Sequence, residues 1–211
     1  MLKVPLHFTT EQDGSTVSLV CYDIYNACDV YDSWCEFEYS MTGKDDWNTY
    51  DIGSVVPLNK GETVYFRAKQ GNVGGNPNLN GLSWYEKYGD ENYGDIYYEV
   101  TKYHYFVMEG SIKADGNIQF LLENTGTIDY VPMYCYSQLF KNCIPLTQAP
   151  LLPATTLTND CYYLMFEGCT SLTQAPELPA TTLADNCYGY MFNGCTSLTQ
   201  APELPAETLA E

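Results

Sequence analysis

The residues best suited to chemistry in this 211-residue chain are its nine cysteines. They comprise a first group and two regular series: Cys21, Cys28 and Cys35; Cys135, Cys161 and Cys187; Cys143, Cys169 and Cys195. A zinc site needs about four converging ligands, usually with two cysteines separated by about two to four residues. Spacings of seven and eight residues do not provide such a pair. We therefore predict no metal site, and reduced thiols that pack as small buried hydrophobes.

The other reactive side chains form no recognisable catalytic pattern. His7 and His104 lie far apart, and the chain has no G-x-S-x-G, glycine-rich phosphate loop or H-E-x-x-H. A cysteine–histidine pair stays open as an alternative, although no cysteine stands out as a nucleophile. Glu36 and Glu38 have the spacing of one strand face, which a solvated sheet surface explains. We predict a protein that is not an enzyme, with no catalytic residue and no cofactor.

A long segment, residues 70–98, combines glycine and asparagine with six aromatic residues: Trp84, Tyr85, Tyr88, Tyr93, Tyr97 and Tyr98. This composition is typical of recognition loops, in which rigid amphipathic rings supply contact area at low entropic cost. We predict an inserted loop that forms a contact surface. The alternative is that some of these tyrosines cover the sheet. A shorter loop, residues 23–34, lacks the ligand spacing of a calcium loop, and we expect it to be solvated.

The last third of the chain repeats with a period of 26 residues. This period relates the two later cysteine series, and also Leu146, Leu172 and Leu198. The best copies read C-Y-x-x-M-F-x-G-C-T-S-L-T-Q-A-P-E-L-P-A-T-T-L, and the first copy is degenerate. Such a repeat predicts a solenoid in which each unit buries its apolar face on its neighbours.

Each unit is predicted to contain one short helix and one short strand. Asp185 or Asn186 is the candidate N-cap. Tyr188 and Phe192 have helical i,i+4 spacing, and Gly194 is placed to end the helix. Leu198 then begins an extended segment, which Pro202 closes. One strand and one helix in 26 residues is the leucine-rich-repeat pattern.

The string M-F-x-G-C-T-S-L-T resembles the BspA-like leucine-rich repeats of gut and oral bacteria, of the Bacteroides type, and of the crAss-like phages of such bacteria. The resemblance covers residues 131–211, as three units. It implies roles in adhesion and protein–protein contact, without catalysis. The family's commoner unit is shorter and rich in isoleucine, so the 26-residue form is a variant. No polar capping repeat follows the third unit, and we expect a longer protein or a partner that covers this end.

The first 110 residues alternate apolar and polar residues between turn signals. The alternating pairs include Leu6 and Phe8, Val64 and Phe66, and Ile118 and Phe120 just beyond. Several short strands of this kind predict an antiparallel immunoglobulin-like β-sandwich over residues 1–110. Its order of segments resembles the immunoglobulin-like module that precedes BspA-like repeats. Residues 111–130 are expected to connect the two modules and to cap the solenoid. The predicted fold class is thus a β-rich chain of two modules.

The charge excludes some partners. The chain has 27 acidic and 9 basic side chains, a net charge of −18, and only Lys141 is basic in residues 131–211. Nucleic acid needs a basic face, and no apolar stretch is long enough to insert into a membrane. We therefore expect neither partner.

These features predict a structural or adhesion protein. The first hypothesis is a phage virion component, such as a head or tail fibre or a decoration protein, located in the particle. Its partners would be other virion or surface proteins or a host-surface glycan, and a homo-oligomer, by analogy a trimer, is expected. The absence of a secretory signal in the first residues and the unpaired cysteines favour this hypothesis. The alternatives are a bacterial cell-surface adhesin and a carbohydrate-binding module.

Overall fold

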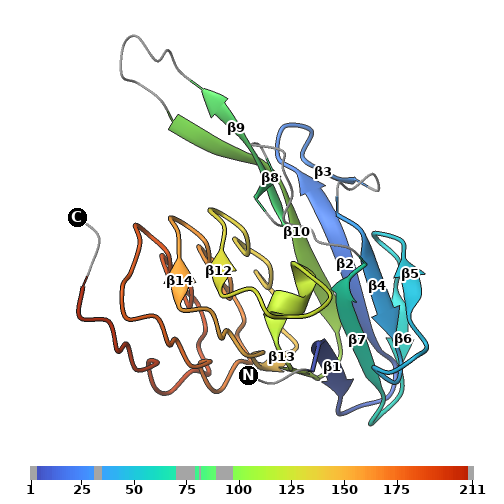
Figure 1. Cartoon of the computed structure of the whole chain (residues 1–211). Coiled ribbons are helices and arrows are strands. Elements are labelled where there is room, and N and C mark those ends of the chain that lie inside the picture. The colour runs from blue at the N-terminus through green and yellow to red at the C-terminus, as the bar shows by residue number, and fades with distance from the viewer. Residues whose placement is uncertain (1–3, 31–34, 70–78, 81, 89–96, 209–211) are drawn as a thin grey trace.

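The computed structural model describes residues 4–30, 35–69, 79–80, 82–88 and 97–208, and its β-rich fold contains two large sheets (Figure 1). The first sheet has the strand order β13 (Leu146–Gln148), β11 (Ile112–Asp115), β1 (Leu6–Thr10), β7 (Thr63–Ala68), β4 (Phe37–Ser40), β5 (Asn48–Tyr50). The second has the order β3 (Cys28–Val30), β2 (Ser15–Asp23), β10 (Tyr97–Glu109), β9 (Ser83–Tyr88), β8 (Leu79–Asn80), and β6 (Val56–Leu58) also pairs with β2. A small parallel pair joins β12 (Tyr130–Val131) to β14 (Thr156–Leu157).

The two sheets pack face to face through the alternating apolar residues of their strands. Along β7 the even-numbered residues are buried, and the odd-numbered ones are partly exposed. The ring of Phe106 on β10 contacts those of Phe8 on β1 and Phe66 on β7, with centroids 4.8 and 5.5 Å apart. Tyr50 of β5 also reaches across, and its hydroxyl accepts a hydrogen bond from the Leu19 N–H at 2.8 Å. The alternation therefore predicted the buried faces of these strands correctly.

Three segments differ from the prediction. Residues 118–121, expected to alternate as a strand, form the 3₁₀ helix η1 (Ile118–Leu121), because the Asn117 side chain accepts the Gln119 N–H and starts a helical turn. The segment 23–34, expected to be a loop, contains β3, which pairs with β2. The segment 70–98 contains β8, β9 and the start of β10, so that it is partly a hairpin and not a loop throughout. Residues 31–34, 70–78, 81 and 89–96 lie outside the described residues.

The repeat units stack side by side through backbone hydrogen bonds. We number the units 132–157, 158–183 and 184–208 as first, second and third. In the first unit alternate N–H groups donate to carbonyl groups 25 residues further on: Tyr134 to Asn159, Tyr136 to Cys161, Gln138 to Tyr163, Phe140 to Met165, Asn142 to Glu167, at 2.7–3.3 Å. The second unit donates in the same way to the third. The 26-residue period therefore matches the spacing of the stack.

The predicted short helix of each unit is absent from the described residues, which form consecutive tight turns instead. The intervening N–H groups bond three residues back, as from Cys135 to Pro132 and from Leu139 to Tyr136. The third residue of alternate turns has a positive φ, as in Tyr134 (56°) and Gln138 (63°), which is the geometry of a type II turn. A helix would donate every N–H within itself and leave none for the neighbouring unit. Asn186 and Gly194 consequently supply positive-φ turn positions, and not the ends of a helix.

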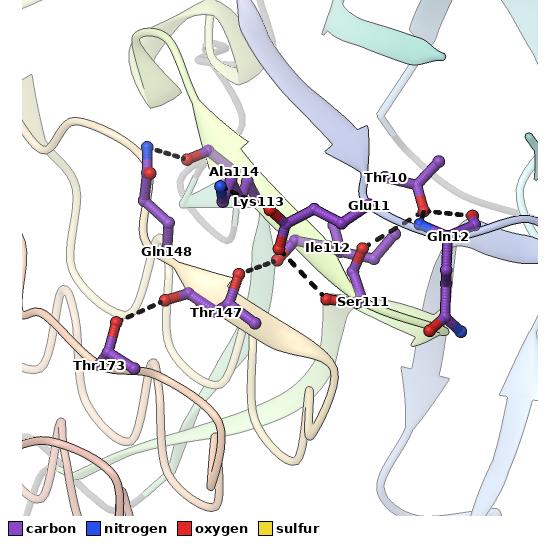
Figure 2. Close-up of polar contacts among 10 residues, drawn as sticks. All are labelled: Thr10, Glu11, Gln12, Ser111, Ile112, Lys113, Ala114, Thr147, Gln148 and Thr173. Carbon is purple, nitrogen blue, oxygen red and sulfur yellow. Dashed lines mark hydrogen bonds and ion pairs between the residues drawn. The ribbon is translucent and has the colours of Figure 1, made fainter. Parts of the chain in front are cut away.

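The first sheet continues directly into the repeat stack (Figure 2). Strand β13 of the first unit pairs in parallel with β11. The Thr147 hydroxyl donates to the Ile112 carbonyl at 3.1 Å, and the Gln148 amide donates to the Ala114 carbonyl at 3.2 Å. One unit further on, the Thr173 hydroxyl donates to the Thr147 carbonyl at 3.2 Å. Sheet and stack therefore share one hydrogen-bonded framework.

The second sheet contacts the first unit through β9 and β10, and Phe106 of β10 makes three of these contacts. The Phe106 N–H donates to the Leu139 carbonyl at 2.8 Å, and its carbonyl accepts the Cys143 thiol at 3.1 Å. The Phe106 ring stacks on that of Phe140 at 5.3 Å. Residues 111–130 were expected to form a connector and cap, but 112–115 belong to the first sheet and β10 supplies part of the cap. A single hydrophobic core runs through both sheets and the units.

We expect Phe140→Ala to destabilise the whole molecule. The ring is fully buried between Phe106 and Phe166, so its removal should lower the free energy of unfolding by about 3–5 kcal/mol. Urea unfolding followed by tryptophan fluorescence measures this effect, because all three tryptophans lie within the first 84 residues. The fluorescence transition should shift together with the circular dichroism. Ile144→Ala, at a side chain that is 57% exposed, is the control and should change stability by about 0.5 kcal/mol or less. An unshifted tryptophan transition in Phe140→Ala would contradict a shared core.

Candidate contact surfaces

The cysteine series of Cys143, Cys169 and Cys195 lies beside a column of phenylalanine rings. The thiols of Cys143, Cys169 and Cys195 each donate to a phenylalanine carbonyl, at 3.1, 3.0 and 3.0 Å. The acceptors are the carbonyl groups of Phe106, Phe140 and Phe166. Rings of adjacent units are nearly parallel, with centroids 5.4 Å apart for Phe140–Phe166 and 5.7 Å for Phe166–Phe192. Each buried thiol therefore joins one unit to the element before it.

The other series, Cys135, Cys161 and Cys187, lies beside a column of tyrosine rings. Cys135, Cys161 and Cys187 are all buried. The rings of Tyr136 and Tyr162 stack at 5.5 Å, and the Tyr136 hydroxyl donates to the Gln119 side chain at 2.6 Å. In the leucine column Leu146 and Leu172 are fully buried, whereas Leu198 of the third unit is only partly so. The structure thus brings the predicted repeat residues together as columns.

The electrostatics of the thiols follow from burial. Burial raises the pKa of Cys169 to about 12, and it raises the pKa of Cys143 well above the ordinary value of a thiol. Burial likewise raises the pKa of Cys21 to about 12. A thiolate is the reactive form of cysteine, so these side chains stay protonated and unreactive near neutral pH. All nine cysteines lie within the described residues and none forms a disulfide; eight are buried and Cys28 is exposed.

The acidic pairs noted in the sequence take part in ion pairs and hydrogen bonds. Glu38 forms an ion pair with Arg67 at 2.8 Å, and Glu36 lies 3.9 Å from Lys69. In the segment 23–34, Asp23 accepts hydrogen bonds from the Asn26 backbone and side chain, which lower its pKa. Within the described part of the chain, no group of three histidine, cysteine or acidic residues could hold a metal ion.

The predicted aromatic contact loop is divided by the structure between strands and undescribed residues. Trp84, Tyr85 and Tyr88 belong to β9, and Tyr97 and Tyr98 belong to β10. The backbone pairs Tyr97 with Tyr88 and Val100 with Tyr85 in antiparallel register. Tyr93 lies outside the described residues. Figure 1 shows this end of β9 and β10 projecting away from the other strands of the second sheet.

A tyrosine cluster that the sequence reasoning did not single out lies on β2 and β10. The rings of Tyr22 and Tyr103 are 5.6 Å apart, and those of Tyr103 and Tyr105 are 5.8 Å apart. All three side chains are partly exposed, and the Tyr105 hydroxyl donates to Asp29 at 3.0 Å. The two-residue spacing of Tyr103 and Tyr105 is the signal that could have identified it. The cluster follows the hairpin tyrosines along the same strand.

A groove of about 690 Å³ runs between the A-P-E-L-P segments of the second and third units. Its walls are Pro176, Leu178 and Pro179 on one side and Pro202, Leu204 and Pro205 on the other, with Glu177 and Glu203 beside them. Leu204 is 54% exposed, and both glutamates are exposed. The groove therefore combines apolar walls with negative charge.

Comparison of the chain with family models, with curated proteins and with solved structures finds no match. Among the described residues, no helix has the length and apolar character needed to cross a membrane.

We expect thiol labelling of the native protein to find one reactive cysteine. Ellman's reagent at pH 8 should react quickly with about one thiol, at Cys28, and with the other eight only after unfolding, because burial keeps them protonated and inaccessible. Cys28→Ser should remove the fast reaction and leave the slow one unchanged. Two or more fast thiols in that variant would mean that the cysteines of the repeat units are not buried.

Proposed function

We propose that this chain is a non-enzymatic structural protein of a phage particle, as a head or tail fibre or a decoration protein that mediates protein–protein or host-surface contact. The observation that carries the proposal is the use of the potentially reactive thiols. Those of Cys143, Cys169 and Cys195 are buried and donate to backbone carbonyl groups between adjacent elements. Their chemistry is thus used to hold the stack together.

The lack of disulfides among the described cysteines supports assembly in a reducing compartment. None of the nine cysteines forms a disulfide, and eight of them are buried. Proteins that fold in oxidising surroundings commonly use cysteine pairs as disulfides, whereas the cytoplasm keeps thiols reduced. A particle component is synthesised and assembled in the host cytoplasm, so this composition suits the proposal.

The proposal includes a more specific assignment of the fold of the sheets and of the repeat units. The face-to-face sheets suit an immunoglobulin-like sandwich, and the hydrogen-bonded 26-residue units suit a variant leucine-rich-repeat solenoid in which turns replace the helix. With the M-F-x-G-C-T-S-L-T motif, this combination supports membership of the BspA-like group and its role in contact. Sheets and units with one core would act as a rigid support for exposed surfaces.

The decisive test is where the native protein is found. Density-purified particles and host envelope fractions should be compared by quantitative mass spectrometry, after alkylation of free thiols. We expect the protein in the particle fraction, with the cysteines of the repeat units in the thiol form. Recovery only from the bacterial envelope would overturn the virion proposal and favour the surface adhesin.

The tyrosine cluster on β2 and β10 favours carbohydrate binding as a second candidate, because partly exposed aromatic rings can stack on sugars. A glycan array tests it with Trp84→Ala and Tyr88→Ala in the hairpin, and with Tyr103→Ala in the cluster. A glycan role predicts a signal that falls at least tenfold in these variants and is retained in Tyr190→Ala on the third unit. An absent signal, or one equal in all four variants, would dismiss this candidate.

A further inference from the structure

His104 is an ionisable residue in the interior of the protein. It lies on β10 and is only 1% exposed. Its Nδ1 atom is 2.9 Å from the Leu82 carbonyl oxygen, which also accepts the His104 N–H at 3.0 Å. Phe37 of β4 contacts the imidazole, with ring centroids 5.5 Å apart, and Cys21 of β2 is its partner in the sheet. A carbonyl group can only accept, so the neutral ring carries its proton on Nδ1.

Leu82 connects this histidine to the repeat stack. It lies between β8 and β9 and is fully buried. Its backbone makes a hydrogen bond with the Cys135 thiol of the first unit. The hydroxyl of the next residue, Ser83, donates to the Tyr134 carbonyl of that unit at 2.7 Å. His104 thus holds, through one carbonyl group, a segment that contacts the first unit. We refer to these five residues as the joint.

The ionisable groups around the joint include three buried thiols. Cys21 lies opposite His104 on β2, Cys35 precedes β4, and Cys135 belongs to the first unit. Burial raises the pKa of Cys21 to about 12, and it also raises the pKa values of Cys35 and Cys135. These thiols therefore stay neutral below pH 7 and supply no negative charge for a protonated imidazole.

The carboxylates of the neighbouring strands β2 and β4 already have cationic partners. Asp23, two residues from Cys21 along β2, pairs with Lys102 at 3.6 Å. Glu38 of β4 pairs with Arg67 at 2.8 Å. Burial consequently has the larger effect on His104 and lowers the pKa of the imidazole, whereas the hydrogen bond with Leu82 raises it. A charged imidazole is thus unfavourable in this position.

We propose that His104 makes the joint between the second sheet and the repeat stack sensitive to acid. Near neutral pH the uncharged imidazole stays buried and the joint is closed. In acid the imidazole gains a proton and leaves its buried position, and Leu82 and Ser83 then separate from the first unit. Phe106 and the pairing of β11 with β13 still connect the sheets to the stack, so the change is a local opening. This property is independent of the proposed function.

The direction of the pH dependence follows from the two states of His104. In the closed joint burial lowers the pKa of this residue to about 4. An imidazole in water has a pKa of about 6.5, so the open joint binds the additional proton between these two values. Closure is therefore favoured above about pH 6.5 and is lost progressively as the pH falls toward about 4. Between pH 7 and pH 5 the ratio of open to closed molecules should rise about 20-fold.

The test measures access to the Cys135 thiol in the full chain with Cys28→Ser, which removes the exposed thiol. The probe is 4,4′-dithiodipyridine, which modifies thiols in acid, and mass spectrometry of peptides identifies each modified cysteine. Each rate is divided by that of the same thiol in the urea-unfolded chain at the same pH, which removes the effect of pH on the reagent. The relative rate of Cys135 should rise about 20-fold between pH 7 and pH 5. That of Cys169, buried in the second unit, should rise less than about threefold.

Two histidine variants separate this effect from the titration of carboxylates. His104→Asn keeps an N–H group for the Leu82 carbonyl but gains no proton, so the rise at Cys135 should fall below about threefold. His7→Asn is the matched control, because the His7 Nδ1 also lies 3.0 Å from a backbone carbonyl, but the side chain is only partly buried. It should retain the full rise. An equal rise in both variants and the parent would overturn the proposal.

The parent protein also decides the matter if His104→Asn does not fold. At pH 5 its far-ultraviolet circular dichroism should be unchanged while Cys135 has become accessible, and a return to pH 7 should restore the protection of this thiol. Equal acceleration of Cys135 and Cys169 would indicate unfolding of the whole molecule and overturn the proposal. A relative rate of Cys135 that stays constant from pH 7 to pH 5 would also overturn it.

Discussion

The repeat stack depends on how each unit divides its backbone N–H groups between two uses. One set closes turns within the unit, and the alternate set donates to the carbonyl groups of the next unit. Buried N–H groups without acceptors are costly, so a unit of this kind is stable only beside a neighbour that completes its hydrogen bonds. The 26-residue period follows, because each unit must present its carbonyl groups in register with the donors of the unit before.

The side-chain columns are a consequence of this register. Equivalent residues lie one above the other, so phenylalanine stacks on phenylalanine and tyrosine on tyrosine at 5.3–5.8 Å. Cysteine suits the position beside the rings, because it is small and apolar but can donate weakly to the carbonyl group of the preceding element. Burial that raises the pKa of these thiols also preserves that donor, since a thiolate could not make the bond.

The two sheets make contacts with the first unit that a preceding repeat unit would otherwise make. Phe106 occupies the place of a repeat phenylalanine, with a ring, an N–H group and a carbonyl group all used as in a unit. Strand β11 also contacts the first unit, because it pairs in parallel with β13. The beginning of the stack is therefore closed by rigid strands. The tyrosine cluster and the proline-walled groove remain at least partly exposed outside this framework.

The sequence by itself determined the period, the buried columns and several of the long strands. Identical residue types at equal spacing must occupy equivalent environments, and alternation of apolar residues marks a half-buried strand such as β7. It did not determine the turn geometry of the units, because asparagine, glycine and i,i+4 aromatic pairs are compatible with both a capped helix and type II turns. Nor did it identify Phe106 as part of the stack, since this residue precedes Phe140 by 34 positions and not by 26. Only the tertiary structure decided both points, because the choice depends on where each backbone N–H finds its acceptor, and in the stack the acceptors of the alternate groups lie in a different unit.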